Sequence, residues 1–392
     1  MSFSFDDHID RRNTRSYKWD QSEKLFGDAD LLPLWVADMD FKSPPQIEEA
    51  LVKRAQEGIY GYQIRTNDID EAIIGWFQRR HQWSIQPGWI SDLPGVVTGL
   101  SLAVECFTEP GDRILVQTPV YYPFFDVIRM NGREIVRSPL LEQDGRFVMD
   151  YADVEQQFRQ GVKLILLCNP HNPGGRVWTK EELSRLGELC LKYGVTVVSD
   201  EIHCDHTYPG HPHIPFASIS EQLADITLTV LAPSKTFNIP GLHYAFMVTP
   251  NAQLKRKLDY RIKALSLHMT NFFGPVATEA AYQYGDEWLD ALLVHLKGNI
   301  DYAIERLENE LPEVKPMRPE GTYLLWVNCR GLGRSVPELK ELMFKQAKVA
   351  FSEGSVFGEE GVGHLRINMA CTRATLKEAL DRFIGAAKSQ AR

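Results

Sequence analysis

Short apolar runs alternate with helical patterns through the middle of the 392-residue chain, and this alternation restricts the fold more than any other feature. The clearest runs are rich in valine, leucine and isoleucine and have the length of buried strands. They lie at 113–117, 162–168, 195–199, 227–231 and 244–249. Strands separated by helices predict βαβ units and a largely parallel sheet covered by helices. We therefore expect an α/β fold with a large domain of this kind.

The segment TKEELSRLGELCLKYG, between two of these runs, carries the signals of a helix at both ends. Thr179 and Glu182 have the spacing of a capping box, in which each side chain accepts a hydrogen bond from the other residue's backbone N–H. Gly194 follows the last turn, where glycine favours the left-handed conformation that ends a helix. The pattern predicts a helix between Thr179 and Gly194.

The pattern changes after about residue 290, where a long amphipathic helix, LVHLKGNIDYAIERLENEL, begins. A strand-like TYLLWVNC, a helix near 336–347, a strand-like HLRINMA and a last helix follow. This mixture predicts a second, smaller α+β domain. The irregular first 45 residues are expected to pack against it. We predict a large domain over 46–290 and a small domain formed by 1–45 and 291–392.

Composition excludes several classes of protein. The hydrophobic fraction of 44% and the charged fraction of 24% are those of a globular protein, and the net charge of −9 argues against a nucleic-acid partner. No apolar run approaches the about 20 residues of a membrane-spanning helix, and the N-terminus does not resemble a signal peptide. The six cysteines are far apart in the sequence, which favours free thiols in a reducing cytoplasm. We expect a cytoplasmic protein without a membrane or nucleic-acid partner.

Polar residues follow directly after successive strand candidates. In open α/β sheets, ligands bind in the crevice beyond the carboxyl ends of the strands. Asn172 follows the run at 162–168, Asp200 directly follows the run at 195–199, and Lys235 follows the run at 227–231. Each could be an ordinary loop residue when taken alone. The three together favour one site, because a desolvated lysine can form a Schiff base and a carboxylate can keep a pyridine nitrogen protonated. These are the needs of pyridoxal 5'-phosphate (PLP), whose ring hydroxylate Asn172 would face.

A phosphate site is expected at the segment VVTGLSLAVECF, where a Thr-Gly turn is predicted to open a helix. Free backbone N–H groups and the positive end of the helix dipole favour an anion at such a position. The chain contains neither GxGxxG nor GxxxxGK[ST], so the dinucleotide and P-loop alternatives lack their motifs.

The stretch SDEIHCDHTYPGHPH invites a metal interpretation, because it concentrates histidines, aspartates and a cysteine. A zinc site would need about four ligands converging as a tetrahedron. Asp200 already has a proposed role, and the other residues follow in a proline-containing loop beside the same site. We therefore expect no metal here.

The chain resembles the fold-type I PLP-dependent enzymes of the aspartate-aminotransferase-like superfamily. Within them it is similar to the cystathionine β-lyase-type C–S lyases of the MalY/PatB group. The segments that carry the resemblance span nearly the whole chain: PLWVADMDF, YGY, VTGLSLAVECF, TPVYYPF, NPHNPGG, SDEIHCD, APSKTFNIPGL and HLRINMACTR. The resemblance implies that the sheet of the large domain is seven-stranded and mostly parallel.

The resemblance also implies roles for individual residues in binding the cofactor. Lys235 becomes the Schiff-base lysine, Asp200 the partner of the pyridine nitrogen, and Asn172 the neighbour of the ring hydroxyl. Tyr121 would stack on the ring, and His203 would lie near it. The candidates on the phosphate side are Gly99, Leu100, Ser234 and, from the neighbouring subunit of a homodimer, Tyr62.

Further residues are implied in substrate binding. Arg366 would hold the substrate α-carboxylate as a bidentate fork. Val36 and Ala37 would approach that carboxylate through their backbone, and Tyr62 would also contact the substrate. One position departs from the common pattern: His243 stands where many aminotransferases have an arginine that binds the phosphate.

The activity implied is α,β-elimination of L-cystathionine or a related cysteine S-conjugate, a small amino-acid substrate, to a thiol such as homocysteine, pyruvate and ammonia. Lys235 would act as the general base and, with Tyr121, as the proton donor to the leaving sulfur. An aminotransferase on the same fold remains an alternative. So does a lyase with a secondary regulatory binding role. A fused winged-helix DNA-binding domain is disfavoured by the short segment before PLWVADMDF.

Overall fold

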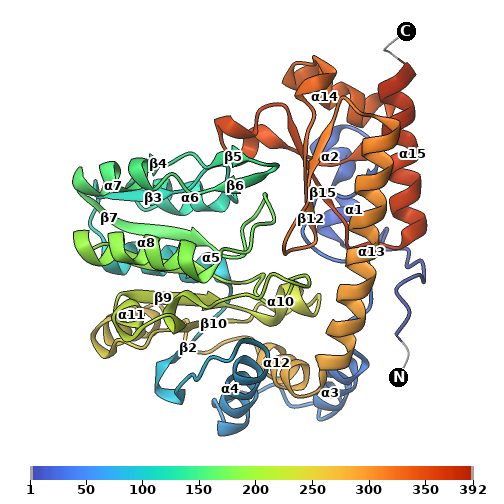
Figure 1. The fold of residues 1–392 in the computed structure, drawn as a ribbon. Coiled ribbons are helices and arrows are strands. Elements are labelled where there is room, and N and C mark those ends of the chain that lie inside the picture. Colours follow the sequence, from blue (N-terminus) through green and yellow to red (C-terminus); the bar gives the residue numbers. More distant parts are fainter. Residues whose placement is uncertain (1–2, 390–392) are drawn as a thin grey trace.

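A seven-stranded sheet and a four-stranded sheet organise the computed structural model, which describes residues 3–389 (Figure 1). The strand order of the larger sheet is β2-β10-β9-β8-β7-β3-β4. Six of these strands run in one direction and β10 runs opposite to them. The prediction of a mostly parallel, seven-stranded sheet is therefore confirmed. Its strands are β2 (Ile90–Leu93), β3 (Arg113–Val116), β4 (Glu134–Arg137), β7 (Val162–Cys168), β8 (Thr196–Asp200), β9 (Thr227–Leu231) and β10 (Ala245–Val248).

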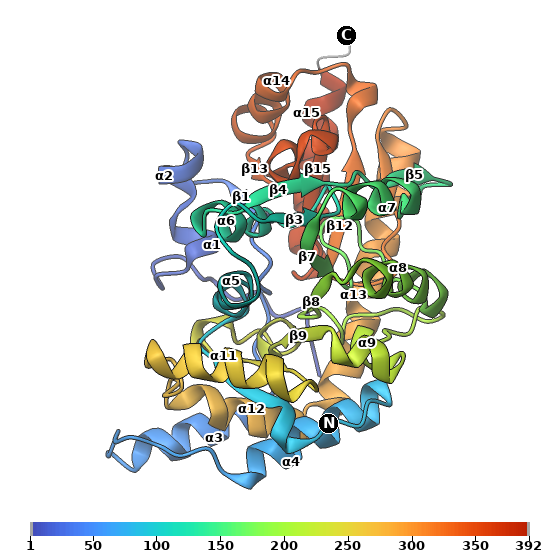
Figure 2. The same cartoon turned by 90° about the vertical axis from the view of Figure 1, so that its left-hand side faces the viewer.

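Helices cover both faces of this sheet, as a parallel sheet requires (Figure 2). One face packs against α5 (Val96–Phe107), α6 (Pro123–Met130) and α11 (Ala252–Ala264), and the other against α7 (Tyr151–Arg159) and α8 (Lys180–Tyr193). The central strands are accordingly buried along nearly their whole length. Helix α8 has the predicted capping box, and Gly194 ends it in the left-handed conformation.

The four-stranded sheet is antiparallel and has the order β11-β12-β15-β14. Its strands are β11 (Lys315–Met317), β12 (Leu324–Asn328), β14 (Ser352–Glu353) and β15 (His364–Asn368). The associated helices are α13 (Asp286–Glu310), α14 (Val336–Glu341) and α15 (Arg373–Ser389). The N-terminal segment joins this part, because β1 (Leu32–Pro33) pairs with β13 (Val349–Ala350).

The remaining elements are short or lie at one end of the large sheet. Helices α3 (Pro45–Gln56), α4 (Asn67–His81) and α12 (Phe273–Tyr284) pack together beside β2. The short elements are α1 (Tyr17–Asp20), α2 (Ser22–Phe26), α9 (Glu221–Asp225), α10 (Pro233–Thr236) and the hairpin of β5 (Leu141–Gln143) with β6 (Arg146–Val148).

Helix α13 crosses the boundary predicted at residue 290, since it begins at Asp286. The division into two domains therefore stays a prediction, and its outermost residues, 1–2 and 390–392, lie outside the described residues. Within 3–389 no helix combines the length and apolar character needed to span a membrane.

Candidate active site

The carboxyl ends of β7, β8 and β9 lie at one edge of the sheet. A polar residue either ends each strand or follows it closely. Cys168 of β7 lies opposite Asp200 of β8, which lies opposite Val230 of β9. Asn172, Asp200 and Lys235 all line one cavity of about 390 Å³ at this edge. The structure thus brings together the three residues that sequence analysis singled out.

Lys235 lies in the single turn of α10 and is half-buried in the wall of the cavity. Nζ donates a hydrogen bond of 2.7 Å to the carbonyl oxygen of Ala37. Burial lowers the pKa of Lys235 to about 8, and the charge of Arg366 adds to this effect, while Asp38 and Asp200 oppose it. The neutral fraction of such an amine near physiological pH is far larger than that of an ordinary lysine, which makes it a competent nucleophile and base.

Asp200 ends β8 with its carboxylate in the same cavity. Its side chain accepts a hydrogen bond of 3.2 Å from the backbone N–H of Ile202. Burial raises the pKa of Asp200 to about 7, although this hydrogen bond and the charge of Lys235 act in the opposite direction. A buried carboxylate with a raised pKa is suited to a cationic N–H partner, which would return it to the charged form.

Tyr121, His203 and Ser234 also line the cavity. Burial lowers the pKa of His203 well below its ordinary value, so its ring is neutral. Within residues 3–389, Nδ1 of that ring has no hydrogen-bond partner. Burial raises the pKa of Tyr121, which keeps its hydroxyl protonated and able to donate. The hydroxyl of Tyr121 and the ring nitrogen of His203 can therefore form hydrogen bonds with a molecule bound in the cavity.

The first turn of α5 closes one end of the cavity, with Gly95, Val96, Val97 and Thr98 among the lining residues. The helix begins earlier than expected: Val96 is its first residue, and the N–H of Gly99 already bonds to the carbonyl of Gly95. Gly99 and Leu100 therefore lie inside the helix rather than in an opening turn. They do not appear among the described residues that line the cavity. The dipeptide Pro94-Gly95, a common punctuation before a helix, was the signal that marked this start.

Gly99 has a packing reason to be glycine. A Cβ at this position would lie 2.7 Å from Cδ1 of Leu93 and 3.1 Å from Cγ1 of Val230. The missing side chain lets α5 approach the sheet closely, and Leu100 is fully buried in the same interface.

Arg366 in β15 is not among the described residues that line the cavity, but it contacts one that is. Its guanidinium donates to Oδ1 of Asn172 at 3.0 Å, to the carbonyl of Trp35 at 2.7 Å and to the hydroxyl of Ser352 at 3.2 Å. Burial lowers the pKa of Arg366 to about 10, although Tyr121 and other tyrosines oppose this, so the group remains charged at neutral pH. The small sheet therefore presents a buried cation next to the edge of the large one.

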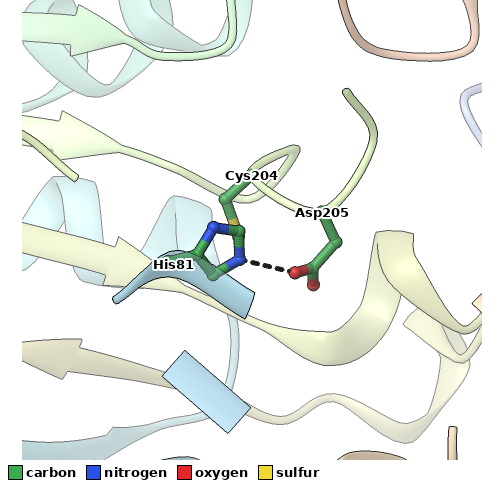
Figure 3. A group of neighbouring side chains, drawn as sticks. All are labelled: His81, Cys204 and Asp205. Atoms are coloured by element: carbon green, nitrogen blue, oxygen red, sulfur yellow. Dashed lines mark hydrogen bonds and ion pairs between the residues drawn. The ribbon is translucent and has the colours of Figure 1, made fainter. Parts of the chain in front are cut away.

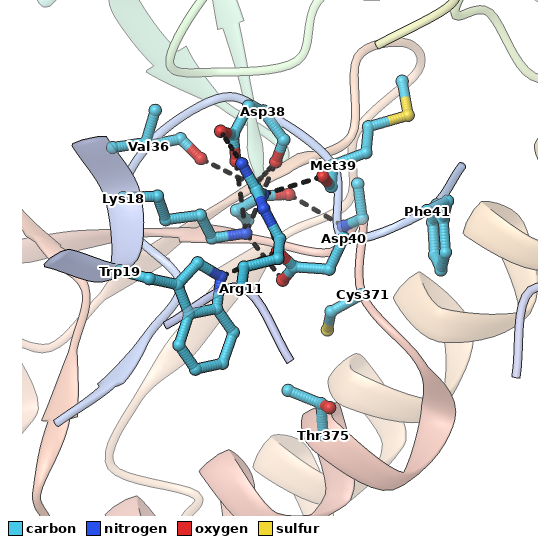
Figure 4. A network of polar contacts seen from close by, with 12 residues as sticks. Arg11, Lys18, Trp19, Val36, Asp38, Met39, Asp40, Phe41, Cys371 and Thr375 are labelled. Carbon is cyan, nitrogen blue, oxygen red and sulfur yellow. Dashed lines mark hydrogen bonds and ion pairs between the residues drawn. The ribbon is translucent and has the colours of Figure 1, made fainter. Parts of the chain in front are cut away.

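The loop that carries Val36 and Ala37 is fixed by an ionic cluster (Figure 4). Arg11 donates to the carboxylates of Asp38 and Asp40, and the fully buried Lys18 donates to Asp40 at 2.8 Å. Two cations thus hold the two aspartates of the VADMD sequence.

Side chains also hold the carbonyl groups of this loop. Asn368 donates to the carbonyls of Val36 and Asp38, and Tyr323 donates to the carbonyl of Ala37 at 2.9 Å. A substrate carboxylate accepts hydrogen bonds, so any contact to it from Val36 or Ala37 would use their N–H groups.

Tyr62 lies away from the cavity that holds Lys235. Its side chain is 94% exposed, in a segment without regular secondary structure between α3 and α4. It lines a separate surface cavity of about 410 Å³ together with Arg65 and Met269.

The histidine-rich stretch forms hydrogen bonds with buried carboxylates. His81, Cys204 and Asp205 bring potential metal-ligand atoms within 4.8 Å of one another (Figure 3). Both oxygens of Asp205 are engaged, by His81 and Trp76 on one side and by Thr236 on the other. Burial raises the pKa of Cys204 well above its ordinary value, so the thiol is protonated. A hydrogen bond joins His81 of α4 to Asp205, and no local sequence pattern indicates that His81 lies beside this loop.

Comparisons with known proteins agree with this geometry. Residues 29–383 match the family described as aminotransferase class I and II. The chain is 46% identical to cystathionine beta-lyase PatB of Bacillus subtilis over 381 residues, with 97% of this chain and 98% of that protein covered. It is 35% identical to protein MalY of Escherichia coli, with 99% of each covered.

A solved structure gives the same result. The crystal structure of cystalysin from Treponema denticola, which contains pyridoxal 5'-phosphate, has a TM-score of 0.96 and 38% identity, with 99% of this chain and 100% of that one covered. The predicted resemblance to fold-type I enzymes and the MalY/PatB group is confirmed. The family match covers most of the chain, and a cystathionine β-lyase aligns with it over 97% of its length. The chain therefore belongs to the class I and II aminotransferase family.

Proposed function

We propose that the protein is a PLP-dependent carbon–sulfur β-lyase. It eliminates a thiol from L-cystathionine or a related cysteine S-conjugate and releases pyruvate and ammonia, with homocysteine as the thiol from cystathionine. The observation that carries the proposal is that Lys235, half-buried and with a lowered pKa, lines the same cavity as the buried carboxylate of Asp200. The full-length similarity to proteins named cystathionine β-lyase supports the reaction class.

The lining of the cavity fits PLP by its chemistry. Lys235 supplies an amine of lowered pKa for the aldehyde carbon, and Asp200 supplies a carboxylate for the pyridinium N–H. Asn172 and His203 suit the ring hydroxyl, and Tyr121 suits the ring face. When bound, PLP supplies an electron sink for negative charge at the substrate Cα.

The phosphate would lie at the first turn of α5, where the N–H groups of Val96, Val97 and Thr98 precede the first hydrogen bonds of the helix. The hydroxyl of Ser234 lines the same cavity and is a second donor. Gly99 and Leu100, also proposed for the phosphate side, would act by holding this turn against the sheet.

Proton transfer is assigned to Lys235 and Tyr121. Nζ of Lys235 takes the proton from the substrate Cα, since burial lowers its pKa to about 8 and so makes the neutral, basic form of the amine far more available than in an ordinary lysine. The same amine, once charged, donates a proton to the leaving sulfur. Tyr121 assists as a hydroxyl donor, because its raised pKa keeps it protonated.

The substrate α-carboxylate is assigned to Arg366, which is buried, charged and oriented by Asn172 and by the carbonyl of Trp35. A guanidinium fork pairs with a carboxylate through two parallel hydrogen bonds. The N–H groups of Val36 and Ala37 would complete the contact. The rigid ionic cluster beneath them favours this assignment, because it prevents the loop from moving away.

The active unit is proposed to be a homodimer in the cytoplasm. Tyr62 and its neighbours Ile59, Tyr60 and Ile64 are exposed along one segment, which is unusual for apolar side chains unless a partner covers them. Tyr62 of the neighbouring copy would then reach the phosphate and the substrate. The free, buried state of the six cysteines suits a reducing compartment.

The division into a large domain over 46–290 and a small domain over 1–45 and 291–392 is also proposed. The strands of the seven-stranded sheet fall within the first range, and those of the four-stranded sheet fall within the second. The cavity lies where Arg366 from the small sheet meets Asn172 from the large one.

The decisive experiment incubates the purified, PLP-loaded protein with L-cystathionine in the absence of any keto acid. The lyase is expected to release pyruvate and free thiol in equal amounts, and Lys235→Ala is expected to release neither. A keto acid that appears only when an amino acceptor is supplied would instead identify an aminotransferase.

A further inference from the structure

The residue after Lys235 makes a short hydrogen bond to a buried carboxylate. The hydroxyl of Thr236 donates to Oδ2 of Asp205 at 2.6 Å. Thr236 is fully buried and Asp205 is 4% exposed. This bond is a direct side-chain link between the turn that holds Lys235 and the loop that follows Asp200.

Asp205 belongs to the loop that carries Asp200 and His203. Two tight turns connect these residues, because Cys204 N–H bonds to the carbonyl of Glu201 and His206 N–H bonds to that of His203. The position of Asp205 is therefore coupled to that of Asp200 over a few residues of compact backbone. The bond from Thr236 joins this loop to α10.

Helix α4 holds the other side of the same carboxylate. Oδ1 of Asp205 accepts from Nε1 of Trp76 at 3.0 Å and lies 2.7 Å from Nε2 of His81 (Figure 3). Burial acts to raise the pKa of Asp205, but the bonds and charge of His81 and the bond of Thr236 outweigh it and lower the pKa to about 2. Asp205 is thus an ionised acceptor that three donors orient.

Helix α10 needs such a contact. It has four residues, and a single helical turn is not stable without tertiary interactions. A lysine that must meet both a ring carbon and a substrate proton also tolerates little displacement. We propose that Asp205 is a positioning residue, which fixes Lys235 relative to Asp200 through its hydrogen bond with Thr236. This inference rests on the proposed function of the Lys235 site.

The test compares Thr236→Val, which removes the hydroxyl at nearly constant volume, with Thr236→Ser, which keeps it. The control is Thr227→Val, at the opposite end of β9, where a fully buried hydroxyl donates to the carbonyl of Leu223 at 2.6 Å. Each purified protein is stripped of cofactor and titrated with PLP. The dissociation constant, the visible absorption band and the thermal midpoint are recorded before any assay of activity.

Thr236→Val is expected to weaken PLP binding about tenfold and to shift the visible band, as loss of a hydrogen bond to a charged acceptor would produce. Thr236→Ser should restore both, and Thr227→Val should lower the thermal midpoint without either change. Identical PLP binding and spectra in Thr236→Val and Thr227→Val would overturn the role of Asp205. A wild-type protein that neither binds PLP nor shows the band would instead overturn the proposed function.

Discussion

The amine of Lys235 donates a 2.7 Å hydrogen bond to the carbonyl oxygen of Ala37, a residue 198 positions earlier in the chain. This contact joins the α10 turn of the large sheet to the N-terminal loop that the ionic cluster holds. It gives the lysine a fixed resting position inside the cavity, where burial lowers its pKa.

The first prediction concerns the titration of Lys235 in the cofactor-free protein. Its pKa of about 8 should make its reactivity toward acetic anhydride half-maximal near pH 8. Lys192, whose pKa the hydrogen bond to Glu155 raises, should react only at much higher pH and serves as the internal control. Competitive labelling followed by peptide mass spectrometry measures both. A Lys235 midpoint at or above that of Lys192 would contradict the burial argument.

The second prediction concerns stability and pH. Folding raises the pKa of Asp200 from its ordinary value to about 7, so the folded protein binds the proton more tightly than the unfolded chain. The stability from this group is fully present below about pH 4 and is lost as the pH rises through 7. Asp200→Asn should therefore stabilise the cofactor-free protein at pH 8 by on the order of 2 kcal/mol, while lyase activity falls sharply.

Urea unfolding of both cofactor-free proteins at pH 5 and pH 8 measures this effect. The gain in Asp200→Asn should be larger at pH 8 than at pH 5. An equal or reversed difference would show that Asp200 is not desolvated as the geometry indicates.

Substitution of Arg366 by lysine should separate substrate binding from cofactor binding. Lysine keeps a charge but cannot make the bonds to Asn172, Trp35 and Ser352 together. We expect KM for cystathionine to rise by about 10- to 100-fold, with the PLP absorption band unchanged. Steady-state kinetics and a spectrum of the same sample provide the check. Loss of PLP with an unchanged KM would place Arg366 in cofactor binding instead.

The buried ion pair of Lys18 and Asp40 should be far more important for stability than a surface pair. Lys18→Met would remove one of the two cations that contact the buried carboxylate of Asp40, the other being Arg11, and we expect a loss of about 2 kcal/mol or more. The matched control is Lys377→Met, which removes an exposed partner of Asp381 and should cost less than about 1 kcal/mol. Denaturant unfolding compares the two. Equal losses would mean that the cluster in Figure 4 does not hold the loop.

Substitution by alanine should change the free energy of unfolding in opposite directions at two helical glycines. In Gly99→Ala the new Cβ would meet Leu93 at 2.7 Å, and we expect destabilisation of about 1–3 kcal/mol. In Gly385→Ala of α15 nothing lies within 4 Å of the new Cβ, and a gain of about 0.5–1 kcal/mol is expected. Thermal unfolding measures both. A neutral Gly99→Ala would refute the close approach of α5 to the sheet.

The sequence predicted the large sheet and the convergence of Asn172, Asp200 and Lys235 for one physical reason. Parallel strands separated by helices must end at the same edge, so residues after each strand meet. The capping box of α8 was equally predictable, because the residues that form it lie three positions apart in the sequence. The predicted start of α5 at the Thr-Gly pair is wrong, because Pro94-Gly95 precedes the helix and Thr98-Gly99 lies inside it.

Contacts between distant segments were not predictable from local patterns. The bonds of Asp205 to Thr236 and to His81 join residues whose spacing follows no helix or strand period. The pairing of Lys18 with Asp40 likewise requires the N-terminal segment to fold back on itself. Such partners become visible only once the chain is placed in three dimensions.

The ionic cluster around the VADMD loop has a practical consequence for any shortened form of the protein. The family match begins at residue 29, but Arg11 and Lys18 lie before it. A chain trimmed to the matched region would keep two inward-facing carboxylates and lose both cations that neutralise them. The region that matches the family is thus smaller than the folded unit, because the residues before it hold the loop whose Ala37 carbonyl contacts Lys235.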